Sequence, residues 1–97
     1  MDVIVERELH CKTDSGQEIA VYIKISKPRL KENQWYNDIS MDGLLDNTYQ
    51  VTGVDSFQSM CLAFGFVRNI LTKFTEAGGT LLWSDQSGIL DMDLMFS

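Results

Sequence analysis

GVDSFQSMCLAFGFVRNILTKFTEA, residues 53–77, is the stretch that decides the fold of this chain. Its apolar residues recur at spacings of three and four, the period of one helix face: Phe57, Met60, Cys61, Phe64, Val67, Leu71 and Phe74. Asp55 is a natural N-cap that Gln58 completes as a capping box, although Ser56 is a second candidate for the cap. A double glycine at residues 78–79 is typical of a helix end. The pattern predicts one long amphipathic helix.

Further apolar residues, Leu62, Ala63, Phe66 and Ile70, widen the stripe beyond one narrow face. We therefore expect the helix to be largely covered. Gly65 lies inside it, where glycine costs about 1 kcal/mol relative to alanine. We expect Gly65 to allow a close approach between the helix and a sheet.

Everything around the helix has the signature of short strands. Residues 3–11 and 19–26 alternate with period 2 around a turn at 13–16, which predicts an antiparallel hairpin. Pro28 ends the second strand, and residues 27–33 form a polar, basic connection. Further strands are expected at 35–40, 48–53, 80–83 and 89–96, with a loop at 41–47 and a hairpin turn at 85–88.

This order predicts a single α+β domain over residues 1–97. Short turns give antiparallel neighbours, and a lone helix must cover one face of the sheet. We expect an antiparallel sheet of about six strands in the order β-β-β-β-α-β-β, with one long helix packed on one face.

Composition narrows the class of partner. The net charge is −6 and the isoelectric point is near 4.5. An acidic surface repels nucleic acid and anionic membranes, so neither is expected as a partner. It attracts basic proteins and speeds their encounter with the chain. The alternative is that the acidity only keeps the domain soluble.

The two cysteines and the amino terminus bear on the compartment. Cys11 and Cys61 have no metal-ligand spacing, and we expect free, partly buried thiols in a reducing compartment. The start of the chain is acidic, unlike a signal peptide, and no segment approaches the ~20 apolar residues of a membrane span. The sequence predicts a cytoplasmic protein.

Catalytic chemistry is not evident in the sequence. His10 is the only histidine, and Cys11 should point to the opposite side of the same strand. No glycine-rich phosphate loop precedes a helix. Asp91 and Asp93 are two apart on a predicted strand, which suits either a divalent cation or an ordinary polar strand face. We expect no enzyme activity, no cofactor and no metal.

Aromatic and acidic residues suggest a binding surface instead. Tyr22 and Tyr36 alternate with the aliphatic residues of their strands, so they should lie on the face that the helix leaves open; Tyr49 joins them in only one register. Tyrosine beside carboxylates is typical of protein-binding surfaces. Oligomerisation or the closing hairpin would instead hide this face. Asp38, Asp42 and Asp46 form either an acidic patch or part of a solvated loop.

The chain also resembles a family of short bacterial proteins of unknown function over about residues 23–90. The resemblance rests on IKISKP at 23–28, Trp35, the GVD start with Gln58, and the LLW that follows the double glycine. That family closes with a Leu-Gly-x-Pro-like segment, whereas residues 90–93 here are LDMD. The resemblance implies no catalytic residue. In size and charge the chain is similar to bacterial immunity proteins.

Together these observations predict an immunity protein that binds a cognate, basic, nuclease-like toxin of a contact-dependent inhibition or other polymorphic toxin system. Carboxylates would steer the association and aromatic side chains would hold the complex. The predicted partner-binding residues are Asp38, Asp42, Asp46, Asp85, Asp91, Asp93, Tyr22, Tyr36 and Trp35. The alternative is a non-enzymatic interaction domain that forms a homodimer or larger homo-oligomer through the open sheet face.

Overall fold

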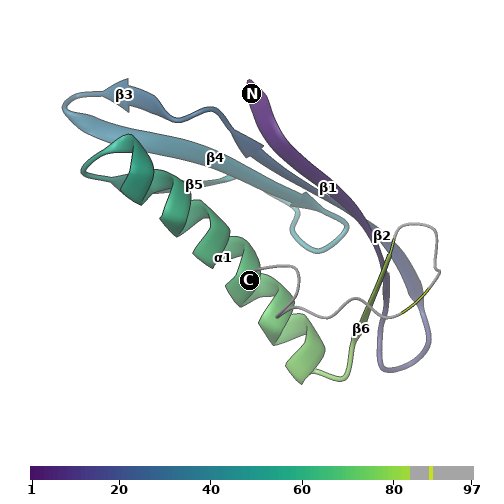
Figure 1. Ribbon diagram of the computed structural model, residues 1–97. Coiled ribbons are helices and arrows are strands. Elements are labelled where there is room, and N and C mark those ends of the chain that lie inside the picture. The colour runs from purple at the N-terminus through teal and green to yellow at the C-terminus, as the bar shows by residue number, and fades with distance from the viewer. Residues whose placement is uncertain (84–87, 89–97) are drawn as a thin grey trace.

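The computed structural model describes residues 1–83 and residue 88. Within them, helix α1 (Ser56–Glu76) lies across one face of a six-stranded antiparallel sheet (Figure 1). The predicted α+β class is confirmed. The strands are β1 (Val3–Lys12), β2 (Glu18–Ser26), β3 (Arg29–Lys31), β4 (Gln34–Asp42), β5 (Tyr49–Gly53) and β6 (Thr80–Trp83). The strand predicted over 89–96 lies outside the described residues. So does the turn predicted over 85–88, apart from Gly88. The Gly88 carbonyl accepts a 3.1 Å hydrogen bond from the Trp83 N–H.

Strand β4 organises the sheet, whose order is β3-β4-β2-β1-β6 with β5 on the other edge of β4. Strands β2 and β3 follow each other along one edge of β4. Their register shifts by one residue, from Ile25 opposite Ile39 to Arg29 opposite Tyr36. Residues 26–28 therefore form a bulge, which accommodates Pro28 because a bulged residue need not donate to the ladder.

Strand β3 was not predicted, because residues 27–33 have the composition of a connection. The two residues that join β3 to β4, Glu32 and Asn33, have positive φ angles of 53° and 65°. These angles are typical of a two-residue type I′ hairpin turn, in which glutamate is an unusual first residue. The predicted loop at 41–47 was also too long, since β4 continues to Asp42.

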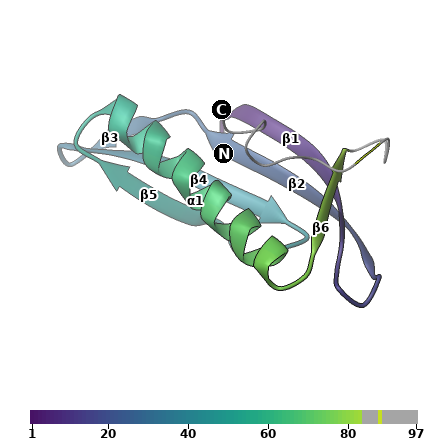
Figure 2. The same cartoon turned by 60° about the horizontal axis from the view of Figure 1, so that its bottom comes forward.

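The core lies between the sheet and one strip of α1 (Figure 2). The helix begins as predicted: the Asp55 carboxylate accepts a 2.7 Å hydrogen bond from the Gln58 N–H, and the Gln58 side chain accepts one from the Val54 N–H. Its contribution to the fully buried set is Ser59, Ala63, Val67 and Leu71. From the sheet come Leu9, Cys11, Val21, Ile23, Ile25, Ile39, Met41 and Leu81.

Two expectations about α1 were wrong. A Cβ at Gly65 would meet no atom within 4 Å, so this glycine faces outward and does not approach the sheet. The close approach is at Gly53, where a Cβ would lie 2.5 Å from the Ser59 backbone nitrogen. The helix is also not largely covered, because Cys61 is exposed and Phe57 is 78% exposed. The apolar stripe is broader than the sheet can cover, so part of it faces solvent.

Candidate protein-binding surface

The sheet face turned away from α1 carries Tyr22 and Tyr36, as predicted. Antiparallel register places Glu8 of β1, Tyr22 of β2 and Asp42 of β4 side by side in one row across three strands. Side chains paired in this way have Cβ atoms about 5 Å apart. Tyr22 is 42% exposed, and both carboxylates are exposed. We call these three residues the Tyr22 row.

The charges nearest the Tyr22 row are mostly acidic. Glu6 and Lys24 are paired in the next row of the same face. Within residues 1–83, no ion pair involves Glu6, Glu8 or Asp42. Glu18, further along β2, lies 3.7 Å from His10 and 4.0 Å from Lys12. Three carboxylates without an ion pair therefore lie around Tyr22.

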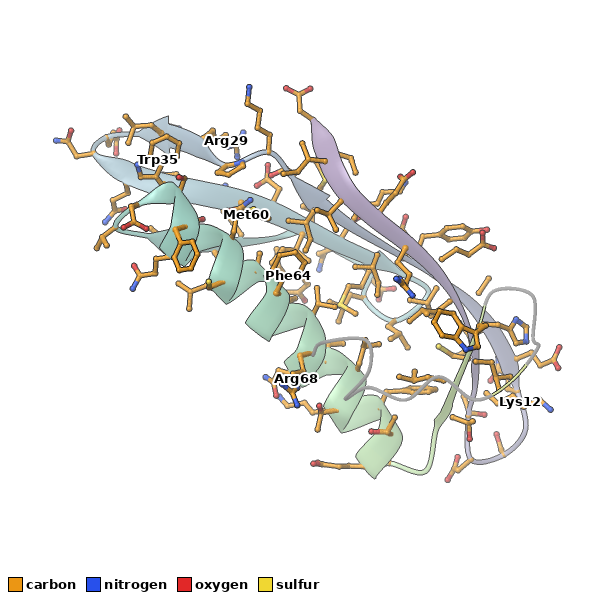
Figure 3. All side chains as sticks on the ribbon, viewed as in Figure 1. Lys12, Arg29, Trp35, Met60, Phe64 and Arg68 are labelled. Carbon is orange, nitrogen blue, oxygen red and sulfur yellow. The ribbon has the colours of Figure 1, made fainter. Side chains whose placement is uncertain are left out.

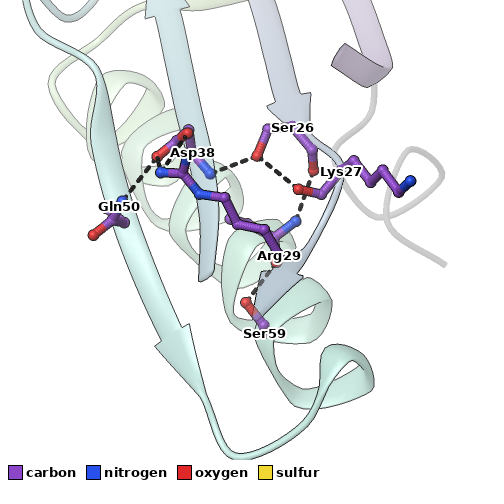
Figure 4. Close-up of polar contacts among 7 residues, drawn as sticks. Ser26, Lys27, Arg29, Asp38, Gln50 and Ser59 are labelled. Atoms are coloured by element: carbon purple, nitrogen blue, oxygen red, sulfur yellow. Dashed lines mark hydrogen bonds and ion pairs between the residues drawn. The ribbon is translucent and has the colours of Figure 1, made fainter. Parts of the chain in front are cut away.

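Asp38 differs from these carboxylates because one cation and one side-chain amide of the same chain contact it. Its carboxylate lies 3.0 Å from the Arg29 guanidinium and accepts a 3.0 Å hydrogen bond from the Gln50 side chain. These contacts tie β3 and β5 to β4 (Figure 4). Only 16% of the Asp38 side chain is exposed. Asp38 is suited to holding three strands together, and less suited to attracting a distant cation.

A buried polar network continues from Asp38 through the sheet to α1. The Asp38 N–H donates to the Ser26 hydroxyl at 2.7 Å, and the Asn37 side chain donates to the Ser26 carbonyl at 2.7 Å. The Ser59 hydroxyl donates to the Asn37 side-chain oxygen. Asn37 and Ser59 are fully buried. Since buried polar groups need partners, this network holds the bulge between β2 and β3 in place and fixes the position of the first turn of α1 against the sheet.

The structure divides the predicted partner-binding residues. Tyr22, Tyr36, Asp38 and Asp42 share the open face. However, Tyr36 and Asp42 are six positions apart along β4, which is about 20 Å. Asp46 is exposed in the turn after β4. Asp85, Asp91 and Asp93 lie outside the described residues.

Trp35 is on the opposite face from Tyr36. It alternates with Tyr36 along β4 and pairs with Gly53, near the start of α1 (Figure 3). Tyr49 likewise leaves the open face, since its ring lies 5.4 Å from that of Phe66 on α1. The three predicted aromatic anchors, Tyr22, Tyr36 and Trp35, therefore do not share one face of the sheet.

Among the described residues, His10 and Cys11 do not form a nucleophile–base pair. His10 and Cys11 lie on opposite sides of β1, as expected. Burial raises the pKa of the Cys11 thiol to about 11, which leaves it protonated and unreactive at neutral pH. Among the residues that the structure covers, no group of three or more histidine, cysteine or carboxylate side chains could hold a metal ion.

The Asn37–Ser59 pair was missed, although the sequence held a signal for it. Asn37 occupies the position between Trp35 and Ile39 that the alternation assigns to the helix-facing side, and Ser59 falls on the strip of α1 that includes Ala63. Two polar residues at apolar positions of elements that pack together indicate a buried hydrogen bond.

Comparison with known proteins gives one match. Neither the search of curated proteins nor the search of solved structures found a similar one. In the described part of the chain, α1 is not apolar enough to cross a membrane. A family model described as a domain of unknown function, DUF6968, matches residues 5–94, and the chain therefore belongs to that family.

Proposed function

We propose that this protein is a bacterial, cytoplasmic immunity protein that binds and neutralises a basic toxin, and that the Tyr22 row is the centre of its binding surface. The observation that carries the proposal is the row itself, an exposed tyrosine between two exposed carboxylates on the face that α1 leaves open. A nuclease-like toxin of a polymorphic toxin system is the expected class of partner.

Charge supports a basic partner. The chain has a net charge of −6, and Glu8 and Asp42 flank Tyr22, while Glu6 lies in the next row opposite Lys24. Such a field raises the association rate of a basic protein, and the gain falls as salt screens it. Tyr22 supplies contact area at low entropic cost once the partner has arrived.

The same charges argue against the alternative, a homo-oligomer formed through the open sheet face. A two-fold axis through this face would bring Glu8 and Asp42 of one copy close to the same carboxylates of the other. Like charges placed opposite each other across an interface cost several kcal/mol. Self-association therefore suits a different surface.

Capture from a lysate of the source bacterium tests the proposal. The baits are the wild-type protein, the variant Glu8→Lys/Asp42→Lys, and a matched control, Glu32→Lys/Glu76→Lys, that changes the net charge equally at exposed positions away from the row. Bound proteins are identified by mass spectrometry.

We expect the wild type and the control to retain a basic protein with a toxin domain in stoichiometric amount. The row variant should retain at least about tenfold less, because truncating or reversing central contacts costs more than changing distant charge. Equal capture by the row variant, or a partner without a basic domain, would contradict the proposal.

A further inference from the structure

The second uncovered surface is the outer face of α1. Phe57, Cys61 and Gly65 are four residues apart, so they form one row along this face, and we call them the outer row. All three are exposed, Phe57 by 78%. Leu62 (44% exposed) and Phe64 (40% exposed) flank the row on its two sides.

This face is unusual for the surface of so acidic a chain. Residues 56–67 contain no charged side chain, although charged residues make up 23% of the sequence. Depletion of charge with enrichment of aromatic side chains marks the centre of an interface. Phe64, which is labelled in Figure 3, also borders a groove of about 170 Å³. The other residues that line this groove are Val5, Glu6, Arg7, Ile23, Ile25 and Val67.

From this geometry we infer that the outer row is a homodimer interface in which two α1 helices cross antiparallel at Cys61. The inference does not depend on the proposed function. Phe57 and Gly65 lie equally far, four residues, from Cys61. A two-fold axis near Cys61 therefore sets the projecting Phe57 ring of each copy over Gly65 of the other, where no atom lies within 4 Å of a Cβ position.

A second copy suits this surface better than a charged partner. Over residues 56–67 each copy presents an uncharged surface, which ends at the exposed Arg68, so the net charge of −6 opposes the contact only at a distance. Gly65, one turn from the crossing, has no side chain and so leaves room for the Phe57 ring of the second copy. No side chain within residues 56–67 would leave a charge unpaired in the contact.

The area available sets the strength of the dimer. Val54, Phe57, Leu62 and Phe64 expose on the order of 400–500 Å² per copy, so pairing buries roughly 800–1,000 Å² in total, which is in the range of weak interfaces. A weak dimer follows, with a dissociation constant in the micromolar range.

Sedimentation velocity over about 1–200 µM protein tests the inference. The wild type should pass from monomer to dimer in this range. Phe57→Ala should raise the dissociation constant at least about tenfold. Gly65→Gln fills the hollow and should abolish the dimer, whereas its thermal midpoint should not fall, because glutamine favours the helix more than glycine does.

Two controls separate this surface from others. Asn69→Gln places the same side chain one turn further along the exposed side of α1 and should leave the dimer intact. Tyr22→Ala, on the open sheet face, should do the same. Wild-type monomer at the highest concentration, or a dimer that survives Gly65→Gln, would overturn the inference.

Cys61 supplies an independent readout on the full chain. Oxidation of the two thiols by copper–phenanthroline and oxygen removes two protons and two electrons and forms one disulfide, which requires the Cα atoms to come within about 7 Å. We expect a covalent dimer that Cys61→Ser prevents. Cross-linking that is unchanged in Gly65→Gln would count against the proposed crossing.

Discussion

Two surfaces that the described residues leave uncovered differ in the chemistry of their side chains. The open sheet face presents Glu8, Tyr22 and Asp42 among further charges, while the outer face of α1 presents Phe57 and Leu62 with no charge over residues 56–67. A charged surface favours a partner of opposite charge, and an uncharged apolar surface favours one with the same character. A small domain can therefore carry two contacts that do not compete for one surface.

The inner face of α1, which packs against the sheet, is apolar as well. Leu71 is fully buried there, whereas Leu62 on the same helix is 44% exposed. Hydropathy alone does not separate these two leucines. Only the buried one contributes its full transfer free energy to folding, and the exposed one keeps its apolar area for association.

The largest expected effect comes from truncating those two leucines. Leu71→Ala should lower the free energy of unfolding by about 2–5 kcal/mol, because it leaves a cavity in the core. Leu62→Ala, the same substitution on the same helix, should lower it by no more than about 0.5 kcal/mol. Urea titration followed by circular dichroism measures both. Equal losses would mean that the two faces of α1 are not distinct in the folding of the monomer.

Asn37 should come next in size. Asn37→Ala leaves the Ser59 hydroxyl and the Ser26 carbonyl without their buried partner, which should cost about 1–3 kcal/mol. Asn69→Ala, at an exposed position of α1, is the matched control and should stay within about 0.5 kcal/mol. A neutral Asn37→Ala would show that the network through the sheet does not stabilise the bulge.

The helix cap should have a smaller effect. Asp55→Ala removes the acceptor of the Gln58 N–H and should cost about 1 kcal/mol. Asp46→Ala removes an exposed carboxylate from a turn and should be neutral within about 0.5 kcal/mol. Thermal unfolding of the two variants, side by side, distinguishes a cap from a mere reduction of negative charge.

The thiols of Cys11 and Cys61 should differ in their rate of reaction with a disulfide reagent. At neutral pH, Cys61 should react with a disulfide reagent at once, while Cys11 should react only as the protein opens. Burial raises the pKa of Cys11 from about 9 to about 11, so the unfolded chain loses this proton first. The stability that the buried, protonated Cys11 thiol contributes is therefore complete below about pH 9, and it is lost as the pH rises toward 11.

Cys11→Ala provides the control for this pH dependence. It should remove the decline in stability between pH 9 and pH 11 that Cys11 causes, leaving the contribution of other groups. Equal reactivity of both thiols in the folded wild type would contradict the burial of Cys11.

Local signals in the sequence sufficed for much of the fold. The Asp55–Gln58 cap fixed the start of α1, and the alternation around the 13–16 turn fixed the β1–β2 hairpin. Strand β3 was not predicted because its turn depends on a positive φ angle at Glu32, and glutamate gives no sign of such an angle in a sequence. Local patterns also cannot reveal how wide the sheet is, so they overstated how much of α1 is covered.

The candidate surface was harder to predict than the fold. Alternation correctly placed Tyr22 and Tyr36 on the open face, and the same alternation places Trp35 on the other one. Which carboxylates have partners depends on register between strands distant in sequence. Asp38 and Asp42 look alike in the sequence, yet only Asp38 lies against Arg29.

Native mass spectrometry of the captured complexes tests most directly the claim that the two uncovered surfaces make separate contacts, because one spectrum reports both the partner and the second copy. The wild type should give two copies of the chain with two of a basic partner. Glu8→Lys/Asp42→Lys should give a dimer without the partner, and Gly65→Gln one copy with one partner. Loss of the partner from Gly65→Gln, or loss of the dimer from the charge-reversed variant, would contradict the claim.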